Sequence, residues 1–177
     1  MTLSELVDVL GSLASEPAEP ARRSDRSDRL SALDHGLQCA FELSTVRPDD
    51  VELQLAGLVH DIGHRFGSDD DHGRLGAACV RALLGDRVAG LVEAHVPAKR
   101  YLVTTDASYR SRLSADSVRT LALQGGPLGP EDAAAFAASP VGAAAVVLRR
   151  ADDAAKVLGR VVPPLAYWLP LLRESAH

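Results

Sequence analysis

The stretch that decides the fold is Leu58-Val59-His60-Asp61-Ile62-Gly63-His64. It ends an apolar segment that starts at Val51 and predicts a helix buried on nearly every side, because hydrophobic residues fill most of its positions. This central helix delivers the doublet His60-Asp61 to the interior, and Gly63 can end it. Adjacent helical residues point about 100° apart, so the doublet is a poor chelate on one helix face. At a helix end the geometry relaxes, and the two oxygens of Asp61 can bridge two ions.

The composition of the 177 residues indicates a single helical domain. Hydrophobic residues make up 46% of the chain but aromatic residues only 4%, so the core is built from Ala, Leu and Val, which favours helices over β-structure. The net charge of −5 argues against a nucleic acid as the main partner. No apolar run reaches the length of a membrane span and no signal peptide follows Met1. We therefore expect a cytoplasmic protein without a membrane partner, in which Cys39 and Cys79 are buried free thiols.

The hydrophobic periodicity predicts an all-α helical bundle and no strand. One domain is expected over residues 1–177, with an N-terminal helix and loop over 1–26, a metal-binding core over 28–160 and a C-terminal helix over 161–177. Pro97 is expected to end one of the helices. The expected helices ahead of the C-terminal one are Leu3–Leu13, Asp28–Leu43, Val51–Asp61, Gly73–Leu84, Arg87–His95, Ala115–Leu123, Pro130–Ala138 and Val141–Leu158.

Histidines and aspartates on several of these helices form one candidate metal centre. A single buried histidine is usually an ordinary core residue, and a lone His-Asp doublet is weak evidence, but an ordered set on separate apolar helices indicates a metal site. Four imidazoles, one bridging carboxylate and one terminal carboxylate suit a dinuclear centre. From spacing alone, Asp153 competes with its neighbour for the last position. The candidate ligands are His35, His60, Asp61, His72, His95 and Asp152.

The order His, His-Asp, His, His, Asp resembles the HD-domain superfamily. Within it, the chain is most similar to the mixed-valent diiron oxygenases that cleave phosphonates, which are relatives of inositol oxygenase. The resemblance covers roughly residues 28–160, and its most specific parts are Lys99–Leu102, Gln124–Pro127 and Asp152–Lys156. The stretches that carry it are Leu33–Ala40, Leu58–His64, His95–Leu102, Leu121–Pro127 and Leu148–Lys156.

The resemblance implies an activity and a cofactor. Members of this family use O₂ as co-substrate and a mixed Fe(II)/Fe(III) pair to oxidise the C–H bond next to phosphorus in a small 1-hydroxyphosphonate, and they release phosphate. It also selects Asp152 over Asp153. The implied ligands are His35, His60, Asp61 and Asp152 for one iron, and His72, His95 and the shared Asp61 for the other.

The resemblance also implies a set of substrate contacts. Physical chemistry supports them, because a dianionic phosphonate needs cations and hydroxyl donors. Lys99 lies one turn beyond one candidate ligand and Arg149 one turn before another, although either cation alone would be an ordinary surface residue. Gln124 and Lys156 are expected to be structural. The implied substrate contacts are His64, Lys99, Ser117, Thr120 and Arg149, and the implied catalytic residues are Asp28, His64 and Lys99.

The chain departs from the family's pattern ahead of its first histidine. Relatives usually carry Tyr-x-x-Glu in a lid segment. The Tyr occupies an open iron position until substrate arrives, and the Glu helps to recognise the substrate. Asp25 and Asp28 stand there instead, within Ser24–Arg29. Asp25 cannot act as a phenolate, and Asp28 keeps the negative charge on a shorter arm or caps the following helix.

Two other classes of function fit the same residues. A metal-dependent phosphohydrolase would use the same ligands to activate water against a phosphate ester. A metal-bearing module could instead sense a ligand or bind a partner without turnover. The C-terminal segment around Trp168 can pack on the domain itself or on a second copy, so both a monomer and a homodimer are compatible with the sequence.

Overall fold

The computed structural model describes residues 1–18 and 30–177, and within them the protein is an all-α bundle, as predicted. The single piece of β-structure among these residues is an isolated bridge between Pro17 and Ser31. The described residues also form three short 3₁₀ turns: η1 (Leu13–Ser15), η3 (Ile62–Arg65) and η4 (Arg110–Arg112). The helices are α1 (Leu3–Ser12), α2 (Ala32–Val46), α3 (Val51–Val59), α4 (His72–Thr105), α5 (Ala115–Leu123), α6 (Pro130–Ala138), α7 (Gly142–Ala154) and α8 (Leu165–Glu174).

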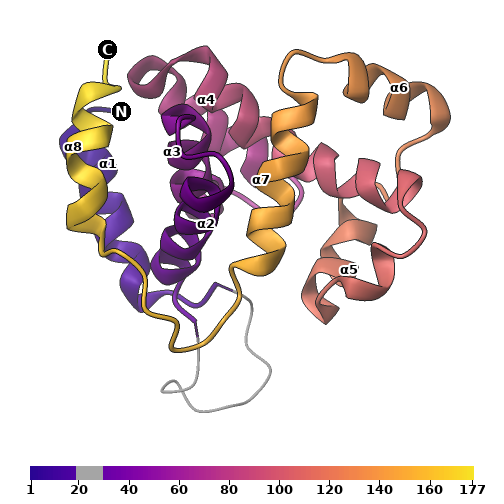
Figure 1. Cartoon of the computed structure of the whole chain (residues 1–177), viewed down its shortest axis with the longest axis horizontal. Coiled ribbons are helices and arrows are strands. Elements are labelled where there is room, and N and C mark those ends of the chain that lie inside the picture. The colour runs from indigo at the N-terminus through magenta and orange to yellow at the C-terminus, as the bar shows by residue number, and fades with distance from the viewer. Residues whose placement is uncertain (19–29) are drawn as a thin grey trace.

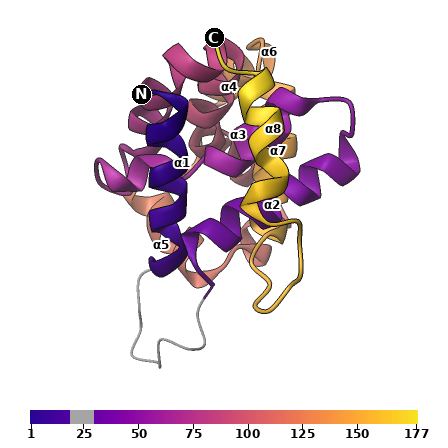
Figure 2. The ribbon, with the colours of Figure 1, turned by 90° about the vertical axis from the view of Figure 1, so that its left-hand side faces the viewer.

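Helix α3 lies at the centre of the bundle, between α2, α4 and α7. Helices α1 and α8 cover one side of it, and α5 and α6 lie on the opposite side of the molecule (Figure 1). Both chain ends lie at the same end of the bundle, as Figure 2 also shows. The expected buried central helix is confirmed, because every residue from Leu53 to Val59 is buried.

The central helix ends earlier than the sequence suggested. Its N-cap is Asp50, whose carboxylate accepts a hydrogen bond from the Leu53 N–H, the kind of cap expected for an aspartate at this position. The helix stops at Val59, so that His60 is its C-cap and Asp61 begins the η3 turn. The doublet therefore sits where helical geometry is relaxed and its two side chains can face the same point.

Helix α4 differs most from the prediction. The expected break after Leu84 is confirmed, because Gly85 has a φ of 82° inside the merged helix, a conformation that favours glycine. The expected end at Pro97 is wrong, since the helix continues to Thr105. Pro97 removes one backbone hydrogen bond, but Ala98 and Leu102 beyond it are buried, and their packing outweighs that loss. Lys99 therefore stays on the helix, one turn beyond His95.

Other helix boundaries also differ from the prediction, two of them by four residues. Helix α2 begins at Ala32, with Ser31 as its N-cap, and not at Asp28, which lies outside the described residues. Helix α7 ends at Ala154 and not at Leu158, because the side chain of Gln38 bonds both the N–H and the carbonyl of Val157 and draws this backbone away from the helix.

The expectations about the cysteines, membrane spans and domain division have different outcomes. Both cysteines are free, but only Cys39 is buried and Cys79 is half-exposed. No single helix in the described part of the chain has the length and hydropathy of a membrane span, and α6 with α7 meets those limits only jointly, across a 102° bend. The division of the chain at residues 26, 28 and 160 stays a prediction.

The η3 turn packs directly on α4 at Gly63. A Cβ atom at this position would lie 1.8 Å from the carbonyl oxygen of His72 and 2.7 Å from the backbone nitrogen of Gly76. Both neighbours are backbone atoms, which cannot move aside as a flexible side chain can. The absence of a side chain at Gly63 thus sets how closely the His60-Asp61 turn approaches the helix that carries His72.

We predict that Gly63→Ala destabilises the protein, because it forces η3 away from α4. Overpacking of this kind costs about 1–3 kcal/mol, which corresponds to a fall of several degrees in Tm for a chain of this length. Thermal unfolding followed by circular dichroism measures it. The matched control is Gly11→Ala in α1, where a Cβ would meet nothing within 4 Å. An unchanged Tm for Gly63→Ala would contradict this account of the η3–α4 contact.

Candidate metal centre

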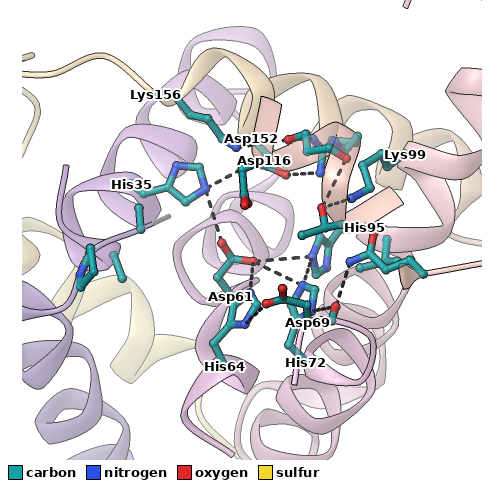
Figure 3. A pocket seen from close by; sticks show the side chains of 18 of the residues that line it. His35, Asp61, His64, Asp69, His72, His95, Lys99, Asp116, Asp152 and Lys156 are labelled. Atoms are coloured by element: carbon teal, nitrogen blue, oxygen red, sulfur yellow. Dashed lines mark hydrogen bonds and ion pairs between the residues drawn. The ribbon is translucent and has the colours of Figure 1, made fainter. Parts of the chain in front are cut away.

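Four imidazoles and two carboxylates meet between the central helices. Four different helices and the η3 turn supply them, so the site exists only when the whole bundle is assembled. Figure 3 shows three of these rings, His35, His72 and His95, around Asp61. The imidazoles are buried, and so is the Asp152 side chain, whereas that of Asp61 is 27% exposed and borders a cavity. The contributors are His35 from α2, His60 at the end of α3, Asp61 at the start of η3, His72 and His95 from α4, and Asp152 from α7.

The Asp61 carboxylate divides the imidazoles into two groups. Its Oδ2 atom lies 3.5 Å from Nε2 of His35 and 3.3 Å from Nε2 of His60. Its Oδ1 atom lies 3.6 Å from Nε2 of His72 and 3.6 Å from Nε2 of His95. One oxygen thus faces each pair of rings, which is the arrangement that a bridging carboxylate needs.

The second carboxylate belongs to the first group. Oδ1 of Asp152 lies 3.1 Å from Nε2 of His35 and 3.8 Å from Nε2 of His60. Its neighbour Asp153 instead contacts Arg149 and Tyr109, away from the imidazoles. Of the two adjacent aspartates, only Asp152 therefore faces the centre.

Backbone carbonyls fix the orientation of all four rings. Each ring has a carbonyl within hydrogen-bond distance of Nδ1, so Nδ1 carries the proton and Nε2 keeps a lone pair directed at the centre. This is the tautomer that binds a metal through Nε2. The pairs are His35 with Ala155 (2.8 Å), His60 with Gly57 (2.8 Å), His72 with Asp69 (2.8 Å) and His95 with Val92 (2.5 Å).

The donor set fits a pair of cations. Nε2 of His60 is buried and has no hydrogen-bond partner in the described part of the chain, and an unsatisfied buried polar atom is costly. Nε2 of His72 lies only 2.9 Å from Nε2 of His95, so two lone pairs face each other. A cation beside each group relieves both conflicts. Two sets of possible ligand atoms, each within 4.8 Å of one another, share Asp61: one with His35 and His60, the other with His64 and His72.

The ionisation of these groups suits metal binding. Burial, together with the charges of neighbouring imidazoles, holds the pKa of His95 well below its usual value, and burial also lowers the pKa of His72. Both are therefore neutral at neutral pH, which is the form of imidazole that binds a metal. Burial alone would lower the pKa of His60, but Asp61 and Asp152 raise it to about 9, so the site stabilises positive charge at this ring. Burial opposes ionisation of Asp152, yet Arg149 keeps its pKa well below the usual range.

A cavity of about 250 Å³ opens beside this centre and carries the cations and hydroxyls expected from the sequence. Nζ of Lys99 donates to Oγ1 of Thr120 at 2.9 Å, and both residues are buried. Burial, and then the charge of Arg149, lowers the pKa of Lys99 to about 8. Of the residues proposed from the sequence, His64, Lys99, Ser117, Thr120 and Arg149 all line the cavity.

His64 occupies the open side of the centre. Its ring stacks on that of His72, with centroids 4.0 Å apart and an interplanar angle of 10°. Nε2 lies 3.9 Å from Oδ1 of Asp61, and Nδ1 lies 3.7 Å from Oδ1 of Asp69. Because its side chain is 41% exposed, His64 can meet a molecule that enters the cavity. Asp25 and Asp28, the proposed lid residues, lie outside the described residues.

Sequence reasoning missed part of the cavity wall. Asp69 and Asp116 line it, and Arg119 forms ion pairs with both. The Asp69 carbonyl also accepts a hydrogen bond from Gln124 at 2.9 Å, which ties the loop before α4 to α5. Gln124, for which the sequence predicted a structural role, makes this contact from the C-cap position of α5. Asp69 lies in a polar loop, where no periodicity marks it.

Comparison with known proteins places the chain in a family. A family model described as the HD domain matches residues 14–153. The hydroxymethylphosphonate dioxygenase of Gimesia maris is 37% identical over 147 residues, which cover 77% of this chain and 73% of the relative. The [1-hydroxy-2-(trimethylamino)ethyl]phosphonate dioxygenase (glycine-betaine-forming) of Leisingera caerulea is 32% identical over 133 residues, or 70% of this chain and 68% of the relative.

An uncharacterized protein of Acanthamoeba polyphaga mimivirus is 31% identical over 135 residues, which cover 70% of this chain and 62% of that protein. The HD-domain match extends over most of the helical bundle and includes every candidate ligand. Two relatives above 30% identity carry names of phosphonate dioxygenases. The chain therefore belongs to the HD-domain family and, within it, to the phosphonate-cleaving oxygenases.

Proposed function

We propose that the protein is an oxygenase that cleaves the C–P bond of a small 1-hydroxyphosphonate with O₂ and releases phosphate. The observation that carries the proposal is the Asp61 carboxylate, which divides four imidazoles into two groups beside a cavity lined by Lys99 and Arg149. The activity in the names of the two relatives agrees with it. A phosphohydrolase acting on a phosphate ester is the alternative, because it would use the same ligands.

We propose two iron ions in a mixed Fe(II)/Fe(III) state as the cofactor. When bound, the iron pair supplies the redox equivalents and the position for O₂ that the oxidation requires. Imidazole and carboxylate donors suit iron, and the fixed ring tautomers hold them ready. His35, His60, Asp61 and Asp152 would hold one ion, and His72, His95 and the shared Asp61 the other.

The cavity residues bind and orient the substrate. Lys99 and the hydroxyls of Ser117 and Thr120 bind the phosphonate oxygens, since a dianion needs a cation and several donors. Arg149 adds a second positive charge at the same wall. His64, on the open side of the centre, takes the proton of the substrate's 1-hydroxyl at Nε2.

The cavity favours a substrate without a quaternary ammonium group. Its volume of about 250 Å³ is below the roughly 300–1,000 Å³ of drug-sized sites. Its described lining contains no Phe, Tyr or Trp, and residues 19–29 contain none in the sequence either, whereas aromatic faces usually bind quaternary ammonium ions. The acidic wall residues Asp69 and Asp116 are already paired with Arg119. Hydroxymethylphosphonate is the simplest substrate that fits.

The atoms of the proposed reaction balance without another reductant. Hydroxymethylphosphonate and one O₂ give formate and phosphate: the C–P and C–H bonds break, the carbon is oxidised to a carboxylate, and both oxygen atoms enter the products. Hydrolysis of a phosphate ester consumes no O₂. The ratio of O₂ consumed to phosphate released therefore separates the two functions.

We predict one O₂ consumed per phosphate released when the iron-loaded protein is supplied with hydroxymethylphosphonate. An oxygen electrode and a phosphate assay measure the ratio. We also expect kcat/KM to be at least about tenfold higher than for the trimethylammonium analogue, because the cavity is small and has no aromatic lining. Phosphate release that persists without O₂ would favour the hydrolase.

The control for this assay is His72→Ala, which removes one ligand of the second group. Loss of a ligand should lower activity by at least about 100-fold, since even partners of ligands contribute 10–100-fold. Full activity of this variant would reject a dinuclear centre, whatever the reaction.

We predict that Lys99 sets an alkaline limit on kcat/KM. Burial and the charges of Arg149 and Lys156 lower its pKa, Asp152 and Asp153 raise it, and the result is about 8. Lys99 is therefore charged below about pH 8 and neutral above it, so kcat/KM should fall towards tenfold per pH unit on the alkaline side. The pH profile of the wild-type protein measures this limb.

Substitution at the same position tests the assignment. Lys99→Met should lower kcat/KM by about 10- to 100-fold, mainly through a higher KM, because it loses a charged hydrogen bond. It should also abolish the alkaline limb, that is, the fall of kcat/KM above about pH 8. Lys99→Arg keeps the charge and should move the limb to higher pH. The exposed Arg173→Met on α8 serves as control. An unchanged limb in Lys99→Met would remove this role from Lys99.

A further inference from the structure

The segment that follows α4 directs one tyrosine into the protein interior. The Asp106 carboxylate stabilises the turn through three hydrogen bonds. Its Oδ1 accepts from the N–H (3.0 Å) and the hydroxyl (2.7 Å) of Ser108. Its Oδ2 accepts from Arg112 at 2.8 Å. The Arg112 guanidinium lies over the ring of Tyr109, 5.9 Å from its centroid. With its backbone held in this way, Tyr109 is only 3% exposed.

The hydroxyl of Tyr109 joins two charged residues of α7. It donates to the carboxylate of Asp153 and accepts a hydrogen bond from Nε of Arg149 at 3.0 Å. Burial raises the pKa of Tyr109, so the hydroxyl keeps the proton that it donates. Tyr109 therefore holds the carboxylate of Asp153 and the guanidinium of Arg149, which lie one helical turn apart on α7.

Arg149 is held on three sides before any substrate enters. Its Nε bonds Tyr109, its Nη2 bonds Asp153 and Ser117, and its Nη1 contacts Oδ2 of Asp152 at 2.7 Å. A guanidinium has five N–H donors, and these contacts use four of them. At most one remains for a phosphonate oxygen, so most of the bonding capacity of Arg149 is directed at the protein.

The contact with Asp152 connects this network to the metal centre. Oδ2 of Asp152 receives Arg149, while its Oδ1 lies 3.1 Å from Nε2 of His35. Arg149 therefore sets the rotation of the Asp152 carboxylate. Tyr109 and Asp153 in turn set the position of Arg149. Partners that hold a ligand in this way typically contribute 10–100-fold to metal affinity.

We propose that Tyr109 and Asp153 are positioning residues that hold Arg149 and thereby fix the Asp152 carboxylate for one of the two metal ions. This inference rests on the proposed function in one respect: it takes Asp152 as a metal ligand. In the described part of the chain, the contacts of Tyr109, Asp153 and Arg149 reach Asp152 and Ser117 but neither His72 nor His95. Loss of the network should therefore weaken one metal position and spare the other.

The experiment is a Co²⁺ titration of the metal-free full-length chain under anaerobic conditions, followed by visible absorption. Wild-type protein should bind two ions. Tyr109→Phe removes a single oxygen atom, and we expect it to lower the affinity of one position by about 10- to 100-fold and to leave the other within about twofold. Tyr167→Phe, on the exposed face of α8, is the matched control and should titrate like wild type. Tm is recorded for each variant.

A second variant covers the case in which Tyr109→Phe fails to fold. Asp153→Asn keeps the size of the side chain but removes the charge that faces Arg149, and it should produce the same one-position loss to a smaller degree. Two wild-type affinities in both variants, or an equal loss at both positions, would overturn the positioning role and leave the proposed function intact. Wild-type protein that binds no Co²⁺ would overturn the proposed function and this inference together.

Discussion

The structure depends on one constraint: the Asp61 carboxylate must face two pairs of imidazoles at once. Its Oδ2 lies within 3.5 Å of one pair and its Oδ1 lies 3.6 Å from each ring of the other. The arrangement places Asp61 just beyond the end of α3, where helical geometry is relaxed and both His60 and Asp61 can face the same point. It also requires that α4 approach the η3 turn closely, which the missing side chain of Gly63 permits. The end of α3 at Val59 and the contact at Gly63 are thus parts of one arrangement.

The apolar core makes this arrangement rigid, and it also leaves buried polar atoms that a cation would satisfy. Buried Leu, Val and Ala side chains surround the centre, so its polar atoms have little water to bond. Backbone carbonyls accept hydrogen bonds from Nδ1 of each ring, but Nε2 of His60 has no hydrogen-bond partner in the described structure, and Nε2 of His72 faces Nε2 of His95. A metal ion converts these unsatisfied atoms into ligands. Folding therefore brings these nitrogen atoms together, and a proton on His60 or a bound metal ion makes the arrangement more favourable.

The sequence predicted the parts of the molecule in which periodicity and chemistry agree. The boundaries of α5 and α6 match the expected ones, since capping residues and proline mark them. It failed where tertiary contacts override local rules. Pro97 does not end α4, because buried residues beyond it hold the helix, and α7 stops early because Gln38 bonds the backbone of Val157. Spacing could not choose between Asp152 and Asp153, and only the packing of α7 shows that one faces the imidazoles and the other Arg149. Tyr109 carried no signal in the sequence, because its partners are 40 and 44 residues away.

The two buried cations of the cavity play different parts, and their surroundings explain the difference. Arg149 lies between two carboxylates, which raise its pKa against the effect of burial, so its charge is already compensated. Lys99 has a neutral hydroxyl as its hydrogen-bond partner, and burial lowers its pKa. A buried cation without a carboxylate beside it is unfavourable, and an incoming dianion removes that cost. We therefore propose that Lys99 gains more from the substrate than Arg149 does and attracts the phosphonate, while Arg149 keeps the proposed ligand Asp152 in position.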